Sequence, residues 1–435
     1  MSANAGVREQ VGFIEPIEGL RGVAVLLVIL FHYAVILDAR FADPWLAAID
    51  GSLVTRVIVR NGMIGVDLFF LITGFLLVLP WLREAAGQGP APSALDFYRR
   101  RSQRILPAYY VQLLVLFFVF VPLLRGFEFW YRNLVYMFQN LSSHIFLVHY
   151  FSPGTSASLS LNGSLWSLAL EAQFYLLLPL LAPVFARAPW RIAVALLACA
   201  IAWRWAAHSH MDGWVAALRA IEPQWNVPEA AARQLLYTQL PGYLGHFAAG
   251  MLAARAWLQW RARPPGPRDR SAWLGIAIAA CLVLWVLHSP GGWILGEVTW
   301  VLALAALAAI FLALVARGLP WAHGLLSSRP LAFAGRVSYS AYLYHLPLLF
   351  LWNLNAPALT GWWLALPLYL VAVFSISWLS YRYVELRERV PTSIAAPIAS
   401  TCNAATPQRT WAKRPESMSM PNAIGAMASP VSIPE

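Results

Sequence analysis

The sequence is poor in charge: only 12% of its 435 residues are Asp, Glu, Lys or Arg, and lysine occurs once, at Lys413. Soluble domains carry about a quarter charged residues, so this chain could not cover a water-facing surface of its size. Hydrophobic residues make up 60% of the chain, and its mean hydropathy is +0.60. This composition predicts a protein whose solvent is lipid. The 21 Trp and 16 Tyr suit the aromatic belts of membrane interfaces.

Cysteine is scarce as well, and its placement indicates no chemistry. Cys199 and Cys281 lie in apolar stretches, Cys402 lies in a polar tail, and no spacing suggests a metal site or a disulfide framework. The net charge of +11 does not indicate a nucleic-acid partner, because the arginines sit between apolar segments and form no single patch. We therefore expect no metal, no nucleic acid and no tightly bound cofactor. No small-residue cleavage pattern ends the first apolar run, so we expect a retained helix and no cleaved signal peptide.

Long apolar runs dominate the chain. A helix that crosses the hydrocarbon needs ~20 apolar residues. The runs predict an all-α, polytopic membrane protein with about ten transmembrane helices, near 18–38, 63–82, 104–124, 165–186, 191–207, 235–257, 272–288, 294–316, 337–353 and 362–382. The stretch 130–150 is broken by polar residues, and we interpret it as an interfacial or lumen-facing segment.

The basic residues predict the orientation of these spans. Most of the 31 Lys and Arg residues fall in alternate connecting segments, which the positive-inside rule assigns to the cytoplasm. Both termini are then cytoplasmic, in a bacterial cytoplasmic (inner) membrane. We predict a short N-terminal segment, 1–17, a transmembrane domain, 18–390, and a disordered tail, 391–435, which is rich in Pro, Ser, Ala, Asn and Thr.

Ionisable residues inside predicted spans are costly and are candidates for function. Arg21 and His32 share the first span, ~16 Å apart along a helix axis. Arg21 would lie at the inner interface and His32 near mid-membrane. His32 is either a hydrogen-bonded structural residue or a general base, since neutral imidazole can take a proton from an attacking hydroxyl. His345, on the ninth span, has a similar depth, so we expect several helices to share a polar cavity.

Two carboxylates enter from the predicted outer side. Asp67 opens the second span and is either a helix-start carboxylate or the partner that orients a histidine. Glu171 lies within the fourth span and shares a helix face with Tyr175, four residues on. It could orient a histidine or bind acceptor hydroxyls.

A basic cluster precedes the third span. Arg101 and Arg104 are three residues apart, so both can face one side of a helix. They either anchor the inner interface or clamp phosphate, which guanidinium groups bind well. Coenzyme A is a cytoplasmic phosphate-bearing molecule.

Several separated motifs resemble those of acyltransferase family 3, in the family's order. They are IEGLRGVAVLLVILFHY, GVDLFFLITGFLL, RRRSQRILPAYY, SLWSLALEAQFYLLLPLL, GRVSYSAYLYHLPLL and YRYVELRERVP, and together they span about 15–388. One departure is the single acid in Ala169–Ala172, where many members have two. Members of this family are membrane O-acyltransferases of lipopolysaccharide, other polysaccharides and macrolides.

The resemblance implies a reaction and site residues. The enzyme would be an O-acetyltransferase that moves an acyl group, preferably acetyl, from acyl-CoA (acetyl-CoA) to a hydroxyl of a cell-surface or exported glycan. The residues implied are, for catalysis, His32, Glu171 and Asp67; for donor binding, Arg101, Arg104 and Arg21; and for substrate binding, Ser167, Trp166, Tyr175 and His345.

Two other functions fit a bundle of helices with buried His, Asp and Glu. One is a proton-coupled secondary transporter, and the other is a glycan-handling membrane protein without acyl transfer. No pair of Gly/Pro-broken helices occurs in symmetric halves of the sequence. Neither alternative requires cytoplasmic arginines at a spacing that suits phosphate.

Overall fold

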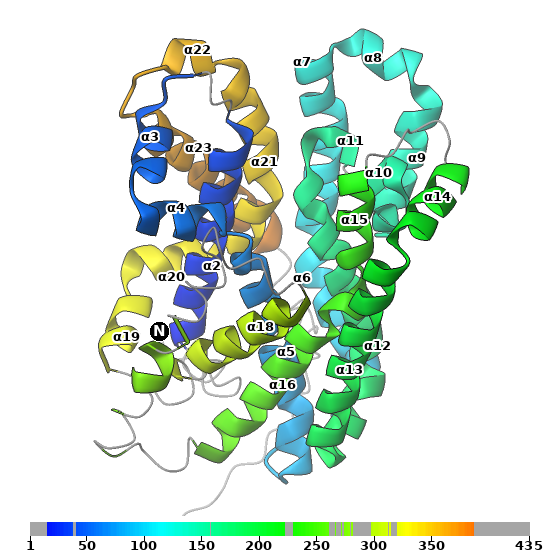
Figure 1. Cartoon of the computed structure of the whole chain (residues 1–435), viewed down its shortest axis with the longest axis vertical. Coiled ribbons are helices and arrows are strands. Elements are labelled where there is room, and N and C mark those ends of the chain that lie inside the picture. Colours follow the sequence, from blue (N-terminus) through cyan, green and yellow to red (C-terminus); the bar gives the residue numbers. More distant parts are fainter. Residues whose placement is uncertain are drawn as a thin grey trace, which may run out of the picture. The chain divides into compact units, whose positions relative to one another are not determined.

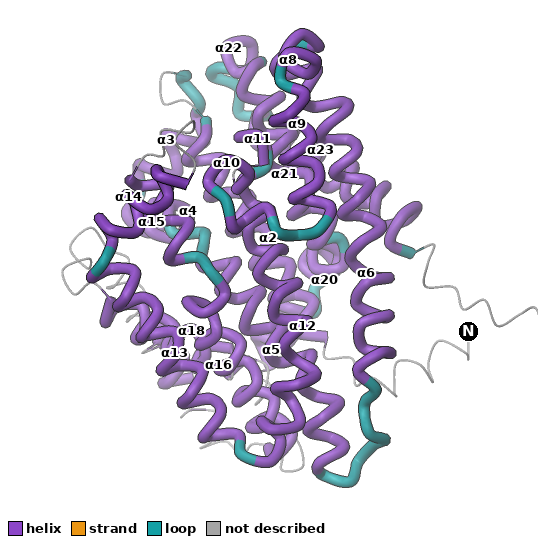
Figure 2. Tube along the Cα trace, turned by 90° about the vertical axis from the view of Figure 1, so that its right-hand side faces the viewer, coloured by secondary structure: helices purple, strands orange, loops and turns teal. Residues whose placement is uncertain are grey.

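The computed structural model describes residues 15–37, 41–156, 158–221, 229–260, 266, 271, 274–278, 280–281, 297–311, 313–314 and 320–386. Within these residues the chain is helical and contains no strand, which confirms the all-α prediction (Figure 2). The predicted tail 391–435 and most of the predicted N-terminal segment 1–17 lie outside the described residues, so both remain predictions.

Six of the described helical segments are long and apolar enough to cross a membrane, and each coincides with a predicted span. They are α2 (Glu15–Ile36), α5 (Ile64–Ala85), α6 (Ala94–Val115) continued by η1 (Leu116–Phe120) and α7 (Val121–Arg125), α12 (Trp166–Arg187), α13 (Pro189–Ser209), and α23 (Ala365–Ser380) continued by η7 (Tyr381–Glu385). The chain is thus a multi-pass membrane protein.

The other four predicted spans are less complete. Helix α16 (Leu240–Trp260) has 21 residues but is less apolar, and α21 (Ser338–Leu354) and α18 (Glu297–Phe311) have 17 and 15 residues. Most of 272–288 lies outside the described residues. The count of ten spans and the cytoplasmic termini therefore stay predictions.

Short helices cap and connect the long ones. The segment 130–150 forms parts of α8 (Phe127–Arg132), α9 (Leu134–Ile145) and η2 (His149–Phe151); α9, with 12 residues, is too short to cross ~30 Å of hydrocarbon. The remaining short helices are α3 (Pro44–Gly51), α4 (Leu53–Arg60), α10 (Pro153–Ser156), α11 (Ser158–Leu161), η3 (Gly163–Leu165), α14 (Met211–Ile221), α15 (Glu229–Tyr237), α19 (Pro320–Leu326), α20 (Arg329–Arg336) and α22 (Ala356–Leu359).

Glycines let α2 pack closely against α19 and α20, as Figure 1 shows at the N-terminal end of α2. A Cβ at Gly335 would lie 1.8 Å from the carbonyl oxygen of Glu18, and one at Gly22 would lie 2.4 Å from that of Leu331. Small residues are what allow helix backbones to approach in a membrane. This contact fixes the position of Arg21, which directly precedes Gly22.

A second close contact joins α5 to α16. A Cβ at Gly74 would lie 2.3 Å from the carbonyl oxygen of Phe247, and one at Gly250 would lie 2.1 Å from that of Leu71. Helix α5 therefore turns one face to α16, another to α2, and a third to α12. That third face carries Thr73 toward Glu171.

Candidate active site

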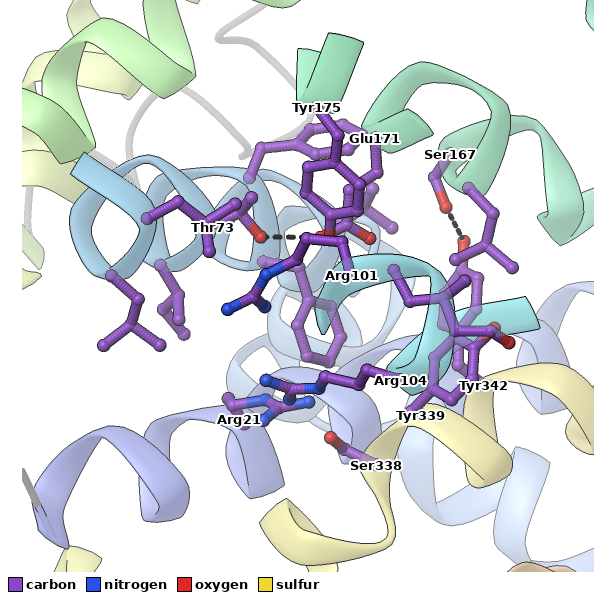
Figure 3. Close-up of a pocket in the computed structure, with 18 residues that line it drawn as sticks. Arg21, Thr73, Arg101, Arg104, Ser167, Glu171, Tyr175, Ser338, Tyr339 and Tyr342 are labelled. Carbon is purple, nitrogen blue, oxygen red and sulfur yellow. Dashed lines mark hydrogen bonds between the residues drawn. The ribbon is translucent and has the colours of Figure 1, made fainter. Parts of the chain in front are cut away.

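A pocket lies between α2, α5, α6, α12 and α21. Four charged side chains line it: Arg21 from α2, Arg101 and Arg104 from α6, and Glu171 from α12 (Figure 3). Three of the four come from different predicted spans, so tertiary packing assembles this charge.

The three arginines gather on one side of the pocket. Figure 3 shows the guanidinium groups of Arg21 and Arg104 next to each other, with that of Arg101 nearby. Glu171 is the one carboxylate among the described lining residues, and no ion pair joins it to these arginines. Like charges held together out of water repel each other, and an anion would relieve that repulsion. The pocket therefore suits an anionic ligand.

Arg101 is held in place by packing more than by hydrogen bonds. Its guanidinium carbon lies 5.9 Å from the centre of the Phe97 ring, and its Nε is buried without a partner among the described residues. Guanidinium groups are strong donors with a fork geometry that matches phosphate and carboxylate oxygens. An unused, buried donor at this position leaves capacity for a ligand.

Glu171 is bound by neutral donors. Thr73 Oγ1 donates to Glu171 Oε1 at 2.9 Å, and the Tyr175 hydroxyl donates to the same oxygen. The second bond confirms that Glu171 and Tyr175 share a helix face. Among the described residues, no histidine is a hydrogen-bond partner of Glu171.

Ser167 and Tyr342 line the same pocket and contact each other. Tyr342 Oη lies 2.6 Å from Ser167 Oγ and donates to the carbonyl oxygen of Ser164 at 2.8 Å. This links α12 to α21. Sequence reasoning missed Tyr342, although it lies one turn before His345 in the GRVSYSAYLYHLPLL motif.

His32 and His345 form a pair. His345 Nε2 lies 3.2 Å from His32 Nδ1, and the ring centres are 5.0 Å apart. His32 is half-buried, whereas His345 is fully buried. Neither lines the pocket, but Tyr342 does, and its ring centre is 5.6 Å from that of His345. The pocket therefore differs from the polar cavity expected around the two histidines, because Tyr342 lines it and neither histidine does.

Asp67 and Trp166 lie elsewhere. Asp67 Oδ1 is 3.3 Å from Nε2 of His246 on α16, so its histidine partner is not His32. Trp166 is buried among aromatic rings, 6.1 Å from Phe70 and 5.5 Å from Tyr243 between centres, and does not line the pocket. No pattern in the sequence pairs Asp67 with His246, because the two residues come from helices far apart along the chain.

Comparison with known proteins identifies the family. Residues 14–382 match the family described as an acyltransferase domain. The chain belongs to this acyltransferase family. The pocket and the histidine pair described above lie within the matched residues.

Two relatives of this acyltransferase are bacterial O-acetyltransferases. The chain is 26% identical to the peptidoglycan O-acetyltransferase OatA of Listeria monocytogenes over 412 residues, which are 86% of this chain and 55% of that protein. It is 30% identical to the O-acetyltransferase OatA of Staphylococcus aureus over 178 residues, 39% of this chain and 24% of that protein. The chain thus spans about half the length of the Listeria relative, and the match to the Staphylococcus relative covers about a quarter of that protein. No solved structure matches it.

Proposed function

We propose that this protein is an inner-membrane O-acetyltransferase that moves an acetyl group from cytoplasmic acetyl-CoA to a hydroxyl of an exported or cell-surface glycan. The observation that carries the proposal is one pocket that gathers Arg21, Arg101 and Arg104 and is also lined by Tyr342, whose ring centre lies 5.6 Å from that of His345. The names of the OatA relatives support acetyl as the group and a glycan, such as peptidoglycan, as the acceptor.

The arginines suit the donor. Coenzyme A carries phosphate groups, and bidentate guanidinium–phosphate contacts are strong and directional. We infer that Arg101 and Arg104 hold the phosphates together with Arg21. The remainder of the donor then extends toward Tyr342, and the thioester reaches the histidine pair beyond it.

His32 is the base in this proposal. Its imidazole takes the proton of the acceptor hydroxyl while the hydroxyl oxygen attacks the thioester carbonyl carbon. The C–S bond then breaks, and the same proton passes to the departing thiolate. The products are an acetyl ester and the free thiol of coenzyme A, so no proton is gained or lost overall. Glu171 is the one carboxylate among the described pocket residues, and in this proposal it holds the acceptor sugar.

Label transfer in membranes tests the proposal. Membranes that contain wild-type protein or the His32→Ala variant at equal abundance would receive radiolabelled acetyl-CoA, and both glycan label and free thiol would be measured. We expect label in the glycan and thiol release with wild type, and neither with the variant. Equal transfer by a folded, inserted His32→Ala protein would remove His32 from the mechanism. Absence of transfer by wild type with several acyl donors would instead favour a transporter.

A further inference from the structure

A base such as His32 needs a group that fixes its orientation, and neither of the two carboxylates expected from the sequence is its partner. Glu171 accepts from Thr73 and Tyr175, and Asp67 lies beside His246. The side chain that faces His32 Nδ1 is His345, from the other end of the chain. The proton between these two imidazoles is bonded either to His32 Nδ1 or to His345 Nε2.

The hydrogen-bond partner of His345 Nδ1 determines which nitrogen carries this proton. His345 Nδ1 lies 2.8 Å from the carbonyl oxygen of Tyr342, which can only accept, so Nδ1 carries the proton. In a neutral imidazole the other nitrogen, Nε2, is then an acceptor. The proton therefore belongs to His32 Nδ1, which shares it between the carbonyl oxygen of Val28 at 2.9 Å and His345 Nε2 at 3.2 Å. His32 Nε2 is left with a free lone pair.

His345 itself is held rigidly. Its side chain is fully buried, and its own carbonyl oxygen accepts a hydrogen bond from the Tyr369 hydroxyl at 2.9 Å. A buried ring anchored on both the backbone and the side chain keeps its Nε2 at one position. The same burial keeps it from touching an acceptor sugar, which argues against the substrate-binding role expected from the sequence.

We propose that His345 is a positioning residue for His32, a neutral imidazole in the place that a carboxylate occupies in a Ser-His-Asp triad. His345 accepts a hydrogen bond from His32 Nδ1–H and so leaves His32 Nε2 as the basic nitrogen. It also stabilises the imidazolium that forms when His32 Nε2 takes the hydroxyl proton. The charged Nδ1–H then makes a stronger hydrogen bond to His345 than the neutral one did. This inference rests on the proposed function of His32 as the base.

Two substitutions at one position separate this role from others. His345→Gln keeps an acceptor oxygen near the place of Nε2, whereas His345→Phe keeps a ring but removes the acceptor. We expect kcat to fall roughly 10- to 100-fold in His345→Phe, as for other partners that orient a functional histidine, with KM for acetyl-CoA unchanged. We expect His345→Gln to recover most of kcat.

Other outcomes overturn the proposal. If His345→Gln is as inactive as His32→Ala while folded, His345 transfers a proton itself. If KM for the acceptor rises while kcat holds, His345 binds substrate. Full activity in both variants leaves it no role. An inactive wild type would instead refute the proposed function, so the two failures are distinguishable.

The protonation of the His32 ring nitrogens can be measured spectroscopically on the wild-type protein, so this test does not depend on the folding of the His345 variants. Nitrogen-15 NMR of histidine-labelled wild type, with the His32 signals assigned by their loss in His32→Gln, reports which ring nitrogen is protonated. We expect Nδ1–H and a bare Nε2 at neutral pH. A signal from the Nε2–H form of His32 would contradict the arrangement directly.

Discussion

At the scale of single residues, the pocket is a place where positive charge exceeds negative charge. Arg21, Arg101 and Arg104 share it with Glu171 alone among its described carboxylates. A hydrogen bond to a charged group contributes about 1.5–3 kcal/mol, and ~1.4 kcal/mol is a tenfold change in binding. The loss of one arginine should therefore weaken anion binding by an amount that can be measured for each arginine separately.

Arg101 and Arg104 are predicted to act on donor binding. We expect Arg101→Ala and Arg104→Ala each to raise KM for acetyl-CoA about tenfold or more, because each removes a charged donor to phosphate. Arg100→Ala is the matched control, since Arg100 is exposed on the same helix and does not line the pocket. An equal rise in KM for the control would show a general surface effect and contradict a specific clamp.

Glu171 is predicted to act on turnover. In Glu171→Gln, we expect kcat to fall because the carboxylate that holds the acceptor is lost, while KM for acetyl-CoA does not rise because less negative charge faces the arginines. Steady-state kinetics with both substrates measure the two effects. Glu128→Gln, at an exposed ion pair with Arg132, serves as control and should change neither constant.

At the scale of helices, close backbone contacts set the positions of the charged groups. Gly335 on α20 and Gly22 on α2 allow the contact that places Arg21 at the pocket. A different tie holds α21, which carries His345: Ser340 Oγ donates to Glu385 Oε1 at 2.6 Å, and Glu385 is buried in η7. Contacts between helices thus involve the motif residues Gly22, Ser340 and Glu385, and these contacts position the helices that carry Arg21 and His345.

The glycine contact is testable with one methyl group. In Gly335→Ala the new Cβ would overlap the Glu18 carbonyl oxygen, so α20 must move away from α2. We expect a loss of stability of about 1–3 kcal/mol, seen as a lower melting temperature in detergent, together with lower activity through Arg21. Gly324→Ala, where the new Cβ meets open space, should melt like wild type. Equal melting of both variants would contradict the packing argument.

At the scale of the whole molecule, the proposal requires that the donor enter from the cytoplasm. Orientation can be measured by labelling single cysteines with a membrane-impermeant maleimide after Cys199, Cys281 and Cys402 have been changed to Ser. Gln88 and Glu128 are both exposed and lie near opposite ends of the continuous segment formed by α6, η1 and α7. We expect labelling of Glu128→Cys in intact cells, and of Gln88→Cys only after the cells are opened. The reverse pattern would refute the predicted topology.

The amino-acid pattern alone predicted the fold class, six of the spans and the contact between Glu171 and Tyr175 within one helix. Low charge and long apolar runs leave helices as the way to satisfy backbone groups in lipid, and the helical period brings Glu171 to Tyr175. Contacts between helices were decided by the tertiary structure. The pairing of His345 with His32, of Asp67 with His246, and of Arg21 with the α6 arginines depends on which helix faces meet. The packing of glycines and side chains over the whole bundle determines which faces meet. The periodicity of one segment carries no information about that packing.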